Sequence, residues 1–182
     1  MNVYVTSDLH FGHKNILKYC PVTRSRFNND VDYMNEQMVF EWNSVVQPND
    51  LVYILGDVAF MPAPIAISFM NRLNGRKILI EGNHDNRLLE NNQFRDCFIE
   101  IHSYLKIKHN GHDVIMFHYP IARFDKMYNG SIHLHGHCHG NTTDLEKFRV
   151  RDVGMDATGK VVSLLDDVIL DALKGEFGFH HD

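Results

Sequence analysis

Short apolar runs alternate with amphipathic stretches in the first half of the chain. Residues 2–6, 51–55 and 77–80 are rich in Val, Ile, Leu and Tyr, and each run stops at polar or glycine residues, which is typical of buried strands. Apolar residues three or four apart predict a helix that runs from the N-cap Asp30 to about residue 46. A second helix is predicted over 63–73, and a short one over 15–19. This order predicts parallel strands joined by right-handed crossovers.

The second half of the chain has a different pattern. The pair Asn110-Gly111 separates two strand-like runs, 99–109 and 113–117, and predicts a hairpin. Further strands are expected at 132–134 and 148–153, and a helix at 163–174, before an irregular tail over 175–182. We find no internal repeat, low-complexity tract or linker, so residues 1–182 are expected to form one domain.

Composition and charge narrow the class of protein. Apolar residues make up 44% and charged residues 23% of the chain, which is ordinary for a globular protein. The net charge of −5 argues against a basic nucleic-acid platform and against an anionic-membrane binder. Three cysteines without a close pair indicate a reducing compartment. Since no signal peptide or membrane span is visible, a cytoplasmic location is expected.

Histidine is the unusual component, with 13 in 182 residues. Several of these histidines lie at the ends of the predicted strands, next to carboxylates, an amide or glycines. Imidazoles and carboxylates in such turns suit divalent first-row metals. The pattern recurs in five short motifs: Asp8-x-His10, Gly56-Asp57, Gly82-Asn83-His84-Asp85, His118 and Gly136-His137-x-His139.

The number of candidate ligands indicates two metal ions. Seven donors are too many for one ion that keeps an open position, whereas two ions that share a bridging carboxylate would use them all. In each D-x-H or H-x-H pair, residues two apart in extended chain would point into the same cavity. The seven are Asp8, His10, Asp57, Asn83, His118, His137 and His139.

Together the motifs, in this order, resemble those of the calcineurin-like metallophosphoesterases, and they extend over most of the chain. The resemblance implies an α/β (α+β) fold with a two-sheet β-sandwich core flanked by helices, and a dinuclear site at one edge. It assigns one metal to Asp8, His10 and His139 and the other to Asn83, His118 and His137, with Asp57 bridging both. We expect Mn²⁺ first, with Fe, Ni, Zn, Co or Mg as alternatives.

The resemblance also implies roles in catalysis. A metal-bound hydroxide would attack the phosphate, and His84 would bind the phosphate and protonate the leaving oxygen. Asp85 would orient His84 or raise its basicity, although it could equally cap the helix that starts at residue 86. Four residues near the expected site edge are candidates for binding the substrate phosphate, each with a plain surface role as the alternative: His13, Arg24, Arg26 and Arg123.

The substrate is less constrained than the chemistry. Without an appended domain or a basic and aromatic stripe, we expect a small phosphodiester or phosphomonoester, such as a nucleotide or cyclic nucleotide, and no membrane partner. A nuclease and a catalytically silent metal-dependent binding protein are the alternatives. A monomer and a homodimer are both compatible with the sequence. His133 and His135 alternate in phase with the ligand histidines, but we interpret them as packing or supporting residues because the ligand set is already complete.

Overall fold

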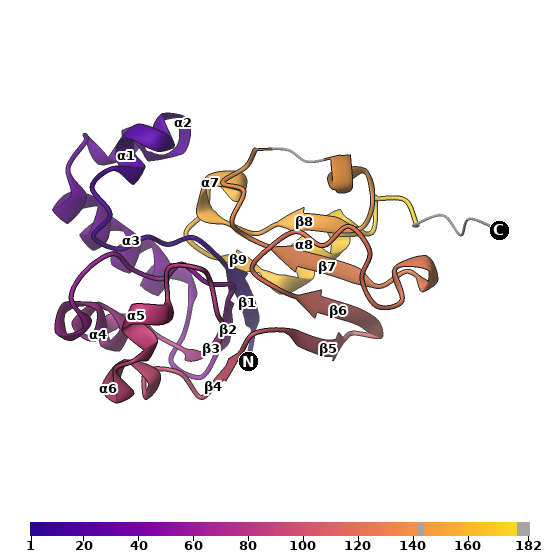
Figure 1. Cartoon of the computed structure of the whole chain (residues 1–182), viewed down its shortest axis with the longest axis horizontal. Helices are drawn as coiled ribbons and strands as arrows, with labels where there is room; N and C mark the ends of the chain where they lie inside the picture. The colour runs from indigo at the N-terminus through magenta and orange to yellow at the C-terminus, as the bar shows by residue number, and fades with distance from the viewer. Residues whose placement is uncertain (142–143, 178–182) are drawn as a thin grey trace.

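A computed structural model of the chain describes residues 1–141 and 144–177, and two β-sheets form its centre (Figure 1). The first sheet has the strand order β4-β3-β2-β1-β9 and the second the order β5-β6-β7-β8. The strands are β1 (Val3–Thr6), β2 (Leu51–Ile54), β3 (Arg76–Ile80), β4 (Glu100–His102), β5 (Leu105–His109), β6 (His112–Met116), β7 (Ile132–His135), β8 (Val150–Asp152) and β9 (Ser163–Leu164).

The first sheet is parallel except at one edge. Strand β2 pairs in parallel with both β1 and β3, β3 pairs in parallel with β4, and the short β9 runs antiparallel to β1. The predicted parallel arrangement of the first three strands is therefore confirmed. Its consequence is that the carboxyl ends of β1, β2 and β3 meet at one edge of the sheet.

The second sheet begins with the predicted hairpin. Strands β5 and β6 are antiparallel and turn at Asn110 and Gly111, both of which have positive φ, as a tight hairpin turn requires. Strands β6, β7 and β8 are parallel to one another. Thus β6 and β7 also deliver their carboxyl ends to a common edge.

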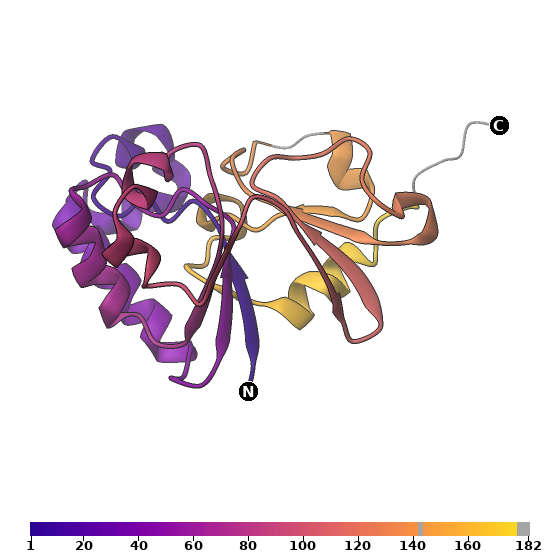
Figure 2. The ribbon, with the colours of Figure 1, turned by 60° about the horizontal axis from the view of Figure 1, so that its bottom comes forward.

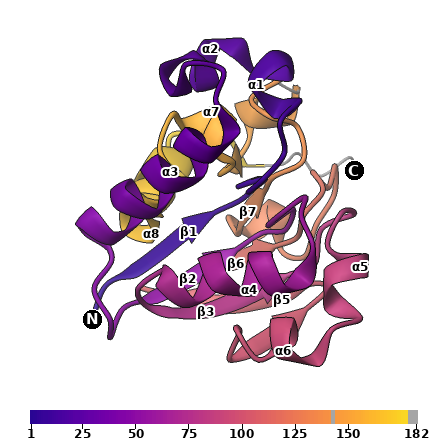
Figure 3. The same ribbon diagram turned by 90° about the vertical axis from the view of Figure 1, so that its left-hand side faces the viewer.

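The helices flank these sheets, with the longest ones on one face of the first sheet (Figure 3). Helix α3 begins as predicted, because the side chain of Asp30 accepts hydrogen bonds from the backbone N–H groups of Asp32 and Tyr33. The helices are α1 (Ile16–Tyr19), α2 (Pro21–Arg24), α3 (Val31–Val45), α4 (Ala63–Arg72), α5 (Asn86–Leu89), α6 (Asn92–Arg95), α7 (Met155–Thr158) and α8 (Leu165–Ala172). Three 3₁₀ turns lie at Ser25–Phe27, Met127–Asn129 and Asp144–Lys147.

Alternate residues along the strands of the first sheet contribute their side chains to two separate hydrophobic cores. On one face Val52 and Ile54 pack with Trp42 and other apolar residues of α3 and α4. On the other face Tyr53 and Leu55 pack against β6, β7 and α8. The period of two in a strand produces this division. The expected two-sheet core flanked by helices is confirmed, and the two sheets face one another across the second core (Figure 2).

Two predicted elements have different boundaries in the structure. Residues 99–109 were predicted as one strand, but the chain leaves the first sheet after His102 and enters the second at Leu105. Likewise the predicted helix over 163–174 begins as strand β9, because Ser163 and Leu164 pair with β1. In both cases the pairing partner is distant in sequence, so local periodicity could not reveal the boundary. The short helices α2, α6 and α7 were not predicted.

No helix in the described ranges is long and apolar enough to cross a membrane. The three cysteines are all free thiols. Most of the predicted irregular tail, including His180 and His181, lies outside the described residues.

Candidate metal centre

The five motifs converge where the carboxyl ends of β1, β2, β3, β6 and β7 meet. Backbone hydrogen bonds join the loops that follow the strands: Asp8 N–H donates to Gly56 O at 3.0 Å, and Gly136 N–H donates to His118 O at 2.9 Å. The backbone N–H of His137 also donates to Asp8 Oδ2 at 2.9 Å, across 129 residues of sequence. The site is thus built at the junction of the two sheets.

One group of donor atoms surrounds Asp8 Oδ1. The Nε2 atom of His10 lies 3.8 Å from this oxygen and 3.8 Å from Asp57 Oδ2. His139 Nε2 lies 3.9 Å from the same Asp8 oxygen. Four donors from three strand-end loops therefore face a common point, and three of them, from Asp8, His10 and His139, lie within 4.8 Å of one another.

A second group lies on the other side of Asp57. His118 Nε2 is 3.6 Å from Asp57 Oδ1 and 3.0 Å from Asn83 Oδ1. His137 Nδ1 is also 3.0 Å from Asn83 Oδ1. The two carboxylate oxygens of Asp57 therefore face different donor groups, which is the arrangement a bridging ligand requires.

Unpaired buried atoms show that these donors fit a cation. Asp8 Oδ1 and both ring nitrogens of His10 are buried without a hydrogen-bond partner among the described residues. Leaving such groups unsatisfied costs about 1–3 kcal/mol each. The ring of His118 donates from Nδ1 to Leu55 O at 2.6 Å, so its Nε2 presents a lone pair to the site. Oxygen and imidazole donors arranged in this way suit divalent first-row cations.

The backbone at these ligands is left-handed, which corrects one sequence-based argument. Positive φ angles occur at Asp8 (55°), His10 (53°), Asp57 (55°), His137 (68°) and His139 (50°). We expected each x-separated pair to converge because it was extended, but both pairs follow their strands in tight left-handed loops. Non-glycine residues in this region carry a conformational cost of about 1–3 kcal/mol and cluster at functional sites.

Comparison with known proteins decides the family. The family model for calcineurin-like phosphoesterases matches residues 1–156. The chain belongs to this family. It is 35% identical over 144 residues to an uncharacterised protein of Methanocaldococcus jannaschii, covering 78% of this chain and 72% of that one. It is 28% identical over 194 residues to the gene 66 protein of Mycobacterium phage L5, covering 89% and 90% of the two chains.

A solved structure has the same fold. The crystal structure of a protein of unknown function from Aquifex aeolicus matches with a TM-score of 0.66 and 26% identity, covering 85% of this chain and 90% of that one. Membership of the family, together with the donor groups around Asp57, identifies the chain as a metal-dependent phosphoesterase in the general sense.

Asp156 contacts the candidate metal centre and was not predicted from the sequence. Its Oδ2 atom lies 2.8 Å from His139 Nδ1, which leaves His139 Nε2 for the site. Burial would lower the pKa of His139, but its hydrogen bonds to Asp156 and Cys20 and the nearby charge of Asp8 outweigh this effect and raise the pKa to about 10. A signal was available, since Asp152 lies near the end of the predicted strand over 148–153 and Asp156 follows it.

Arg24 does not have the position predicted for a phosphate ligand. Its side chain is fully buried, and its guanidinium makes two hydrogen bonds to Asp156, at 2.8 and 2.9 Å. The remaining N–H groups donate to the backbone oxygens of Leu9 and Asp8, at 3.1 and 2.7 Å. Because its donors are occupied inside the protein, Arg24 supports the Asp8 loop and Asp156 in place of the predicted substrate contact.

Asp85 also differs from both interpretations of it. Its carboxylate is fully buried and accepts backbone hydrogen bonds from Asp57 and Val58 at 2.9 Å and from Gly82 at 2.8 Å. It makes no side-chain cap to α5. Asp85 therefore joins the loop of Asp57 to the turn of Asn83 by hydrogen bonds, and does not orient His84 or cap a helix with its side chain.

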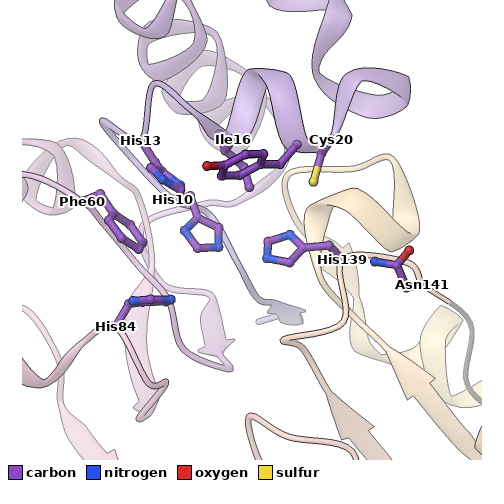
Figure 4. A pocket seen from close by; sticks show the side chains of 9 residues that line it. His10, His13, Ile16, Cys20, Phe60, His84, His139 and Asn141 are labelled. Carbon is purple, nitrogen blue, oxygen red and sulfur yellow. The ribbon is translucent and has the colours of Figure 1, made fainter.

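His84 and His13 lie beside the donor groups and line a common cavity (Figure 4). The side chain of His84 is 47% exposed, and its Nε2 is 4.0 Å from Asp57 Oδ2. The ring of His13 stacks on Phe60 with centroids 4.1 Å apart. Burial and the neighbouring histidines lower the pKa of His13 to about 4, so it is neutral at physiological pH.

The other two predicted substrate contacts are placed differently from each other. Arg26 pairs with Glu41 of α3 at 2.9 Å and lies over the Phe27 ring, so its charge is directed to the helix and not to the site. Arg123 is exposed in the loop between β6 and β7, and its predicted contact stays a prediction. His133 and His135 are buried in β7 and belong to neither donor group.

Close approach of loops explains two glycines of the motifs. A Cβ atom at Gly136 would overlap Ser7 Oγ and Asp8 Oδ2. One at Gly56, where φ is +89°, would lie 2.6 Å from the backbone of Gly82 and 2.7 Å from His118 Nδ1. These positions let the strand-end loops approach closely enough for the ligands to meet.

Proposed function

We propose that the protein hydrolyses a phosphoester with two bound divalent cations. The observation that carries the proposal is the position of Asp57, whose two oxygens face separate groups of candidate ligand atoms. One cation would be held by Asp8, His10 and His139, and the other by Asn83, His118 and His137, with Asp57 shared. Mn²⁺ is the ion we expect first, and Fe, Ni, Zn, Co and Mg suit the same ligands.

When bound, such a pair of cations lowers the pKa of a coordinated water to about 7 and neutralises charge on the phosphoryl group. The protein's own part is to hold the phosphate and to deliver a proton. Among the described residues, His84 is the one histidine beside the site that is half exposed and outside both donor groups, so its ring can reach the leaving oxygen as a general acid. His13 lies near enough to contact a phosphate or its substituent.

The substrate that we propose is a small phosphoester, a nucleotide or cyclic nucleotide being the chemistry considered first. Lys106 of β5 pairs with Asp125, and Lys126, in the loop between β6 and β7, pairs with Asp113. A long polyanion needs a continuous cationic track, which these neutralised pairs do not provide. This favours a small substrate over a nucleic acid.

The test is hydrolysis of bis-p-nitrophenyl phosphate and p-nitrophenyl phosphate by metal-stripped protein. Mn²⁺, Ni²⁺, Zn²⁺ and Mg²⁺ are added back singly, and Asp57→Asn and His84→Ala are assayed in parallel. We expect metal-dependent turnover that Asp57→Asn abolishes with loss of bound metal, while His84→Ala lowers kcat by about 10²–10⁴-fold with two ions still bound. Absence of turnover with every ion, while two ions bind per chain, would overturn the proposal and favour a metal-dependent binding protein.

A further inference from the structure

An aromatic cavity adjoins one side of the candidate metal centre. It has a volume of about 420 Å³ and is lined by Phe60, His13 and Tyr19 together with His84. The Phe60 ring lies 4.6 Å from the ring of His84 and 5.2 Å from that of His10 (Figure 4). We call it the Phe60 cavity. It opens next to His10 and His139, two ligands of the first donor group.

A row of aromatic rings leads away from the second donor group. The ring of Tyr119 lies 4.7 Å from that of His137 and 5.0 Å from that of His118. Phe117 follows at 5.5 Å from Tyr119, and Tyr104 at 6.3 Å from Phe117. Tyr119 is 37% and Tyr104 43% exposed, so ring surface is open to a ligand. We call these three residues the Tyr119 row.

The two surfaces contact opposite halves of the ligand set. The Phe60 cavity touches His10 and His139, whereas the Tyr119 row touches His118 and His137. A phosphate held between the two donor groups therefore has one aromatic surface on each side. A monoester could occupy only one of them.

We propose that the site selects a phosphodiester that carries a planar ring on each ester arm, with a dinucleotide as the fitting class. This inference rests on the function proposed above. Stacking of a base on an aromatic side chain tolerates any base. Both surfaces would therefore bind a planar ring without selecting which base it is. The paired lysines beside Tyr104 provide no track for a longer strand, which favours a free dinucleotide over the end of a nucleic acid.

The position of His84 sets the direction of cleavage. Because His84 lines the Phe60 cavity, the arm in that cavity is the leaving group. The bond from phosphorus to this arm breaks and a bond from phosphorus to the oxygen of water forms. One proton of the water goes to the leaving alcohol. The products are a free alcohol and a phosphomonoester whose remaining arm lies on the Tyr119 row.

The test uses three substrates with the same leaving group: bis-p-nitrophenyl phosphate, methyl p-nitrophenyl phosphate and p-nitrophenyl phosphate. Only the first has a second ring for the Tyr119 row. We expect Tyr119→Leu to lower kcat/KM for it by about tenfold and to change the other two by less than about twofold. Tyr119→Phe should retain the wild-type preference. Phe60→Leu should lower kcat/KM for all three, and Phe40→Leu, on the exposed surface of α3, should change none.

For each variant, the ratio of kcat/KM for the two diesters is compared with the same ratio in the wild type. Differences in the intrinsic reactivity of the two substrates then cancel. The variants are first shown to bind two metal ions. An equal loss on both diesters in Tyr119→Leu would overturn the inference, as would hydrolysis of the monoester alone by the wild type. If no substrate is turned over, the proposed function fails, which is a separate result.

A second arm of the experiment distinguishes the sources of such a diester. Thymidylyl-thymidine and an oligothymidylate of 20 nucleotides are compared by their rates of cleavage and by the products formed. Faster cleavage of the dinucleotide supports a free dinucleotide as the substrate class, while preference for the oligomer overturns that assignment. In either case the phosphate should remain on the arm opposite His84, giving a single positional product.

Discussion

The carboxylate of Asp156 accepts a hydrogen bond from His139 Nδ1 at 2.8 Å while it holds the buried guanidinium of Arg24 at 2.8 and 2.9 Å. Burial raises the pKa of Asp156, but the hydrogen bonds from His139 and Arg24 and the charge of Arg24 outweigh it and keep the pKa well below its usual range. One carboxylate thus fixes the orientation of the ring of His139, a candidate metal ligand, and neutralises the arginine beneath the Asp8 loop.

We expect Asp156→Asn to lower metal affinity by about 10- to 100-fold, because His139 loses the charged partner that orients its ring. Isothermal titration of metal-stripped protein with Mn²⁺ measures this. The matched control is Asp166→Asn, which removes a carboxylate from His109 in an exposed pair at 2.7 Å. Equal affinities in the wild type and Asp156→Asn, with both folded, would show that Asp156 does not support the site.

Substitution of Asp85 tests whether its carboxylate holds the Asp57 loop against the Asn83 turn. Asp85→Ala leaves three buried N–H groups without an acceptor and should reduce the free energy of unfolding by about 3 kcal/mol or more. Urea denaturation measures the loss, and Asp96→Asn on the exposed surface is the control. If Asp85 instead tuned His84, Asp85→Asn would shift the pH profile of kcat. We expect no shift.

Gly136 tests whether close packing of two loops forms the site. Gly136→Ala places a methyl group on Ser7 and Asp8, so the end of β7 must move away from the end of β1. We expect metal affinity to fall by about 100-fold, the upper end of the range for disturbed ligand support. Gly111→Ala, in the turn between β5 and β6, is the comparison: its φ of +87° strains an alanine, but nothing lies within 4 Å of a Cβ atom there. A similar affinity in both variants would contradict this interpretation.

His133 makes stability depend on pH below neutrality. Burial and the neighbouring His135 lower its pKa to about 4, while its ring bonds to Ile115 O at 3.2 Å and accepts from Ile121 N–H at 3.1 Å. The unfolded chain binds this proton near pH 6.5, so between about 6.5 and 4 the unfolded state holds more protons than the folded one. Stability is therefore full above pH 6.5 and falls, by about 3 kcal/mol in total, as the pH drops through this window.

We expect His133→Gln to flatten this dependence, since its amide can make similar hydrogen bonds without titrating. Urea denaturation of metal-stripped protein at several pH values from 7 to 4.5 measures the slope. The wild type and the variant should differ most at the lowest pH. Parallel slopes in the two proteins would exclude His133 as the titrating group.

Much of the fold was accessible from the sequence because its signals are local. The apolar runs of β1, β2 and β3, the N-cap Asp30 and the Asn110-Gly111 turn each depend on neighbours within a few residues. The motif residues could be placed at strand ends for the same reason. The spacing of Asp8 and His10 also predicted two side chains that the structure brings together, although their backbone is left-handed and not extended as we argued.

The buried contacts that hold the candidate ligands in place depend on tertiary structure. Arg24 and Asp156 are 132 residues apart, and their pairing depends on how α2 and α7 are brought together. The passage of the chain from one sheet to the other after His102 likewise depends on partners far along the chain. The sequence by itself determined which side chains end the strands. Only the packing of the two sheets decided which buried charges meet there, because a charge in the interior is stable only beside its partner.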